Sequence, residues 1–167
     1  MIMAPEPVVL PAESVSAIIA EVRRHGRLDL ETGGFLLGPE AEPSRVEVIA
    51  LAGDQGIERA WGLFRVSGRA VEQIFAWAEE HELRIPAQFH SHGRGARLSS
   101  LDRREGFNVR GFISCVVPSY RKPPPDPLAW GWWWFNGTSW VDAPAPAFRA
   151  GRAAVVTFDE AGVRARA

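Results

Sequence analysis

Residues 89–102 hold the side-chain types of a metal site. His90 and His92, two of the four histidines, stand one residue apart, and Asp102 follows ten residues after the second. Alternate residues of a strand point to the same face, so both imidazoles reach one point in space if a strand ends here. Ser99 and Asp102, spaced i and i+3, share one face of a helix's first turn. Two imidazoles and one carboxylate leave the fourth position of a tetrahedral metal open, which is the pattern of a catalytic zinc.

Ser99 and Asp102 also have an interpretation that needs no metal. A serine at the N-cap and an acid three residues later favour a helix start by themselves. The two interpretations are compatible, because one carboxylate can serve both. Cys115 lies in an apolar run and is interpreted as a core side chain, since a lone buried cysteine usually fills space.

Periodicity predicts the elements that position these side chains. Apolar residues recurring at helical spacing predict helices over residues 11–25 and 68–81, the second N-capped by Ser67, and a short helix from Ser99 to near Gly106. Strands are expected over residues 34–37, 45–51, 61–66, 86–91, 111–117 and 153–158, with a hairpin of residues 130–135 and 138–141 across Asn136-Gly137. Residues 162–167 are expected to fray. His25 and His81 are interpreted as charges at helix C-termini.

Together these elements predict one α/β domain over residues 1–167, with its core at about 8–158. Short loops and hairpins favour a curved, mostly antiparallel mixed sheet flanked by helices. The strand at 130–135 is apolar on both faces, so one face is assigned to the core and the other is left to a homodimer or substrate contact.

Composition narrows the class of protein. The 167 residues are 46% hydrophobic and 23% charged, as in an ordinary globular domain, and the net charge is −1. That charge gives no reason to expect nucleic-acid or membrane binding. A single cysteine excludes an internal disulfide and fits a cytoplasmic location, and the first ten residues do not read as a secretory signal.

An acid before a Gly-Gly strand completes a recognisable motif. The run Glu31-Thr32-Gly33-Gly34-Phe35-Leu36-Leu37-Gly38, followed by His90-Ser91-His92 and then Ser99-Ser100-Leu101-Asp102, resembles the JAMM motif of the JAB/MPN metallopeptidases. The chain looks most similar to the compact prokaryotic JAB proteins, over about residues 8–141. The resemblance implies a single MPN/JAB-like domain.

The resemblance also implies roles for the motif residues. His90, His92 and Asp102 would bind Zn²⁺, Glu31 would act as general base, and Ser99 would help to bind the oxyanion. The chain departs from the family in one place. The loop between His92 and Ser99 is one residue shorter than usual, and Gly93 replaces a common proline. We expect this loop to change shape while the three ligands still converge, because its glycines absorb the deletion.

The function that the resemblance implies is zinc-dependent cleavage after the C-terminal glycine of a ubiquitin-like protein. The bond would be an isopeptide in deubiquitinase-like deconjugation, or a precursor peptide bond, and E1-like and E2-like proteins would be pathway partners. Residues 54–64 and 118–127 lie where eukaryotic deubiquitinases carry insertions. Both are short here, which argues against a dedicated polyubiquitin surface.

Three alternatives stay open on the sequence. The same site would process a sulfur-carrier ubiquitin-like protein. A non-catalytic MPN scaffold or binding module would share the fold, although such relatives usually lose ligands. RadC-like proteins linked to DNA usually carry an Asn between the histidines, where this chain has Ser91.

Overall fold

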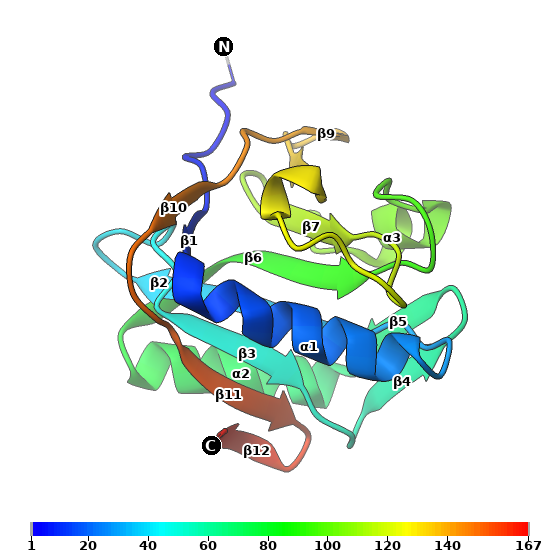
Figure 1. The fold of residues 1–167 in the computed structure, drawn as a ribbon. Coiled ribbons are helices and arrows are strands. Elements are labelled where there is room, and N and C mark those ends of the chain that lie inside the picture. The colour runs from blue at the N-terminus through cyan, green and yellow to red at the C-terminus, as the bar shows by residue number, and fades with distance from the viewer. Residues whose placement is uncertain (1, 167) are drawn as a thin grey trace.

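An eight-stranded mixed sheet runs through the centre of the structure, a computed structural model that describes residues 2–166 (Figure 1). The strand order is β12-β11-β3-β2-β6-β7-β8-β9. The β11–β3 and β6–β7 pairs are parallel and the remaining neighbours are antiparallel. The predicted α/β class with a mostly antiparallel mixed sheet is therefore confirmed.

The strands of the central sheet are β2 (Gly33–Pro39), β3 (Val48–Ala52), β6 (Leu83–Ser91), β7 (Ile113–Val117), β8 (Gly131–Phe135), β9 (Trp140–Asp142), β11 (Ala154–Asp159) and β12 (Gly162–Ala165). Two smaller units flank it: β1 (Val9–Pro11) pairs in parallel with β10 (Ala147–Arg149), and β4 (Ile57–Ala60) forms a hairpin with β5 (Leu63–Val66). The helices are α1 (Val15–Gly26), α2 (Gly68–Glu80) and α3 (Ser100–Glu105), with 3-10 turns at Ala12–Ser14 and Pro127–Ala129.

The two long helices cover opposite faces of the sheet (Figure 1). Because side chains alternate along a strand, each face supplies its own core. Ile18 and Val22 of α1 pack with Phe89 on one face, and Ile74 of α2 packs with Phe35 on the other. None of the helices in residues 2–166 has the length or apolar character that a bilayer crossing demands.

The tryptophan-rich strand β8 divides between these two cores. The rings of Trp130, Trp132 and Trp134 are buried on the α1 side. Trp133 and Phe135 are partly buried and pack against the core on the α2 side. The chain thus supplies packing partners for both apolar faces of the strand.

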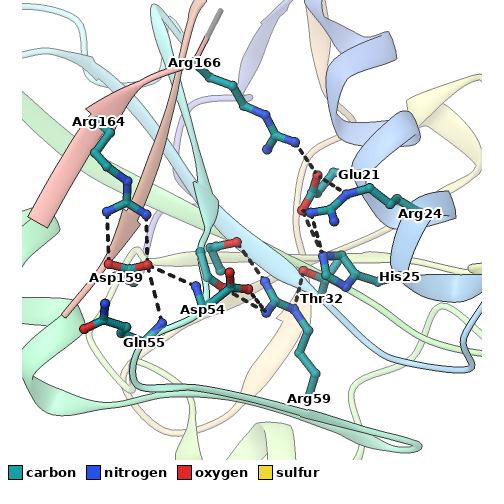
Figure 2. Close-up of polar contacts among 12 residues, drawn as sticks. Glu21, Arg24, His25, Thr32, Asp54, Gln55, Arg59, Asp159, Arg164 and Arg166 are labelled. Atoms are coloured by element: carbon teal, nitrogen blue, oxygen red, sulfur yellow. Dashed lines mark hydrogen bonds and ion pairs between the residues drawn. The ribbon is translucent and has the colours of Figure 1, made fainter. Parts of the chain in front are cut away.

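The C-terminal segment is a strand, so the predicted fraying of residues 162–167 is wrong over β12, while residue 167 lies outside the described residues. Gly162, with φ +118, makes the turn from β11. Arg164 then donates two hydrogen bonds to the buried carboxylate of Asp159, at 3.0 and 2.9 Å, and Arg166 reaches the buried Glu21 at 3.1 Å (Figure 2). Ion pairs with these two buried carboxylates therefore order a segment that was expected to fray.

Two other expectations change. The predicted strand at 61–66 is the second half of a hairpin, because Trp61 and Gly62 form its turn and β4 precedes it. His25 lies in the last turn of α1 as expected, but its ring is buried, with Nε2 at 3.0 Å from Glu21 Oε1. The last turn of α1 lies under the loop after β7, where Gly26 packs directly against the Tyr120 backbone.

Candidate metal centre

Strand β6 delivers the two histidines. His90 is opposite Gly33 of β2 and opposite Val116 of β7, so the strand is held on both sides where it ends. The His92 N–H donates to the Val117 carbonyl at 2.9 Å, which keeps the backbone extended one residue past Ser91. The i, i+2 spacing then brings both imidazoles to the same side, with ring centroids 4.8 Å apart.

Helix α3 delivers the carboxylate through its own N-terminal cap. Ser99 Oγ accepts the Asp102 N–H at 3.1 Å, and Asp102 Oδ2 accepts the Ser99 N–H at 2.8 Å, forming a capping box. The same Oδ2 lies 3.0 Å from His92 Nε2 and 3.2 Å from His90 Nε2. The capping interpretation of this serine–acid pair is confirmed, and the cap fixes the rotamer that brings the Asp102 carboxylate to the histidines.

Three polar atoms therefore meet at one point. His90 Nε2 and His92 Nε2 are 3.1 Å apart, which closes a triangle with Asp102 Oδ2. Three hydrogen bonds along its edges would need three protons. Each ring nitrogen carries at most one proton and the carboxylate carries none. A cation satisfies all three atoms together, and ligands about 2.0–2.1 Å from a tetrahedral zinc lie roughly 3.4 Å apart, close to these separations.

His90, His92 and Asp102 thus form a group that can hold a metal ion. Burial alone would raise the pKa of Asp102, but hydrogen bonds from His90 and His92 lower it far below its ordinary value. Burial lowers the pKa of His92, and the adjacent Asp102 more than reverses this effect, so the net shift is upward. The carboxylate is therefore ionised across the physiological range, as a metal ligand must be.

Glu31 lies beside this triangle, in the segment between α1 and β2. Its side chain is buried, and Oε1 lies 3.9 Å from His92 Nε2. Burial raises the pKa of Glu31 to about 7; His92 opposes the shift and Asp102 adds to it. A carboxyl group with this pKa exchanges protons readily at neutral pH, which is what a general base requires.

An open cleft of about 480 Å³ runs past Glu31, His92 and Ser99. Its other lining residues are Asp29, Trp61, Gly62, Gly93, Arg94, Gly95, Tyr120 and Arg121. Trp61, at the tip of the β4–β5 hairpin, is 81% exposed. On the other side of the triangle, His90 and Asp102 border a smaller cavity of about 120 Å³ beneath β5.

The structure brings together all five residues that the motif singles out. His90, His92 and Asp102 form the triangle, and they converge despite the short loop between His92 and Ser99. Glu31 and Ser99 face the adjoining cleft. Trp61, Tyr120 and the Asp29–Arg121 ion pair, at 2.7 Å, also line that cleft, and they were not predicted there from the sequence. They come from three separate loops, and no spacing rule relates them.

Comparison with known proteins identifies the fold and no activity. No protein-family model matches the chain. A solution structure of a protein from Desulfitobacterium hafniense superposes with a TM-score of 0.63 at 17% sequence identity, covering 86% of this chain and 93% of that one. A solution structure of a protein from Salinibacter ruber gives a TM-score of 0.49 at 24% identity, covering 78% of this chain and 88% of that one. The first likeness supports the fold alone.

Metal binding is the first testable consequence. We expect the wild-type chain to bind one Zn²⁺ per molecule, and His92→Ala or Asp102→Asn to weaken binding by about 100-fold or more, because each removes one of three ligands. Calorimetric titration with Zn²⁺ measures this. His81→Ala is the matched control, since His81 bonds to its own helix at Trp77 O and should bind like wild type. Equal affinity in His92→Ala and His81→Ala would contradict the site.

The raised pKa of Glu31 predicts a pH dependence of stability in chelator-treated protein. The folded chain holds this proton up to about pH 7, whereas the unfolded chain releases it near 4.5. Folding stability therefore falls as pH rises from 4.5 to 7, by up to roughly 3 kcal/mol from this group. Denaturant unfolding should show the folding stability of Glu31→Gln rising relative to that of wild type as the pH increases from 4.5 to 7. A stability difference that stays constant with pH would contradict the buried carboxyl.

Proposed function

We propose that this protein is a zinc-dependent peptidase or isopeptidase of the JAB/MPN type, which cleaves after the C-terminal glycine of a ubiquitin-like protein. The observation that carries the proposal is the convergence of His90 Nε2, His92 Nε2 and Asp102 Oδ2 within 3.2 Å, beside the buried carboxyl group of Glu31. Support also comes from the order of the motif elements along the chain. A chance His-x-His pair would not be expected to meet one acid from the segment before β2 and a second from α3.

The donor set fits zinc. Two imidazole nitrogens and one carboxylate oxygen are ordinary zinc ligands, and three of them leave a position for water or substrate. Zinc held there would supply Lewis acidity, which polarises a carbonyl group and acidifies water. Cys115, the one thiol, is buried in the α1-side core and takes no part.

Glu31 is placed to move the protons of the reaction. Its carboxyl group is buried, borders the cleft and lies beside His92, so it can take a proton from attacking water and give one to the leaving amine. Ser99 contributes a hydroxyl whose oxygen is already engaged by the Asp102 N–H. The hydroxyl hydrogen remains to be donated toward the cleft, where an oxyanion would form.

The cleft suits an extended chain. It is open and partly walled by glycines, and its volume of about 480 Å³ accommodates a few residues of peptide. A flexible C-terminal tail enters such a cleft, whereas a folded domain would stay outside it. The choice of a ubiquitin-like tail ending in glycine rests on the family resemblance, as do E1-like and E2-like partners. Processing of a sulfur-carrier protein uses the same site with another partner.

The competing function is a non-catalytic MPN scaffold or binding module. It shares the fold and needs neither the metal nor the acid. The two proposals differ in what Glu31 does, because a scaffold has no use for a buried carboxyl group facing a cleft. A single substitution at Glu31 therefore separates them.

The direct test uses a ubiquitin-like protein from the same genome, fused through its C-terminal glycine to a fluorescent protein. We expect zinc-loaded wild type to release the fluorescent protein. Glu31→Gln should be slower by about 10²–10⁴-fold, the range of general-base catalysis, while binding the same one zinc. Gel analysis and zinc content are the measurements. Equal cleavage by Glu31→Gln, or no cleavage of any ubiquitin-like fusion by zinc-loaded wild type, would refute the proposal.

Trp61 tests where the substrate lies. An exposed indole at the cleft rim offers a large apolar surface to a bound tail. We expect Trp61→Ala to raise KM by about 10-fold while kcat stays within roughly 2-fold, because remote contacts mainly affect binding. Phe148→Ala is the matched control: this aromatic residue is 43% exposed and does not line the cleft. An unchanged KM in Trp61→Ala would place the substrate elsewhere.

A further inference from the structure

A buried arginine joins the β4–β5 hairpin to the segment that carries Glu31. The Arg59 side chain is only 9% exposed. Its Nε donates to Thr32 Oγ1 at 3.1 Å, and its two terminal nitrogens donate to the carbonyls of Gly53 at 2.8 Å and Ala52 at 2.7 Å (Figure 2). Burying a guanidinium is costly unless its donors are satisfied, so these three oxygens define one position for the side chain.

Thr32 is held from its other side by the histidine strand. Its N–H donates to Ser91 Oγ at 2.9 Å. Its carbonyl accepts the Ser91 N–H at 2.8 Å and the Ser91 hydroxyl at 3.3 Å. Thr32 is fully buried. The Thr32 backbone is therefore fixed to β6 between the two histidines, and its side chain is fixed to Arg59.

Among residues 2–166, the contacts of Glu31 itself are weaker than those that hold the adjacent Thr32. Its own N–H makes one long bond to the Ala60 carbonyl, at 3.3 Å. Its carboxylate lies 3.9 Å from His92 Nε2, which is beyond hydrogen-bond distance. A general base must keep its oxygens free for the reacting proton, so its position has to come from the backbone.

We infer that Thr32 and Arg59 are positioning residues for Glu31. The bond between the Arg59 guanidinium and the Thr32 hydroxyl fixes the backbone on which the base is mounted and ties it to the hairpin that borders the cleft. The inference rests on the proposed function for its kinetic consequence. Neither side chain lines the cleft, so neither is assigned a contact with substrate.

Two substitutions at Thr32 test the hydroxyl alone. Thr32→Val keeps the side-chain shape and removes the acceptor, whereas Thr32→Ser keeps the acceptor. We expect Thr32→Val to lower kcat by about 10–100-fold with KM within roughly 2-fold, since a misplaced base slows chemistry without weakening binding. Thr32→Ser should restore most of kcat, and both variants should hold one zinc. Loss of kcat in both, or in neither, would overturn the inference.

A second measurement does not depend on activity. Amide hydrogen exchange followed by NMR should show the Glu31 N–H exchanging at least about 10-fold faster in Thr32→Val than in wild type, with core amides such as that of Cys115 unchanged. Thr32→Ser should exchange like wild type. Unchanged exchange at Glu31 in Thr32→Val would overturn the inference. If zinc-loaded wild type cleaves no ubiquitin-like fusion, the proposed function fails, and the exchange experiment still decides whether Thr32 positions Glu31.

Arg59→Met supplies the partner half of a double-mutant cycle. If Arg59 acts through the Thr32 hydroxyl, the double variant should have a kcat within about 2-fold of Thr32→Val alone. Full additivity of the two losses would overturn the coupling. Should Arg59→Met fail to fold because its buried carbonyl partners are left unpaired, the two Thr32 variants still decide the question.

Discussion

The candidate site depends on one constraint: two imidazole nitrogens and one carboxylate oxygen meet at a single point. Three polar atoms at 3.0–3.2 Å from one another cannot all be paired by the protons available to them. The arrangement is stable only where the scaffold leaves no alternative. Strand β6 is held between β2 and β7, and the capping box of α3 fixes Asp102. A cation would relieve the constraint, and the same rigidity would leave a metal held there open to the cleft.

The antiparallel pairing of β2 with β6 explains how Glu31 joins residues that follow it by 59 positions or more. Gly33 lies opposite His90, and a Cβ there would collide with the Phe89 carbonyl and the Phe64 ring. Glycine at this position lets the strands and the hairpin approach closely, which places Glu31 beside His92. Gly33 is therefore part of the candidate site, although it has no side chain to contribute.

Much of the fold and of the candidate site was predictable from the local sequence. The remainder was unpredictable because it depends on contacts between distant parts of the chain. Spacing of two and of three residues places side chains on one face, so the pairing of His90 with His92 and the cap at Ser99 follow from the residues alone. The α/β class follows from periodicity. Gly26, next to His25, packs on a loop nearly a hundred residues away, and Arg166 bonds to Glu21 of α1, 145 residues before it. Such long-range contacts leave no local pattern.

The measurement that tests the metal centre most directly is anomalous diffraction at the zinc edge from crystals grown with Zn²⁺. A metal held by the triangle should give one strong peak per chain, at about 2.0–2.1 Å from His90 Nε2, His92 Nε2 and Asp102 Oδ2, with Glu31 outside bonding distance. A peak bound through Glu31 in place of Asp102, or zinc found only at surface residues away from this triangle, would contradict this expectation.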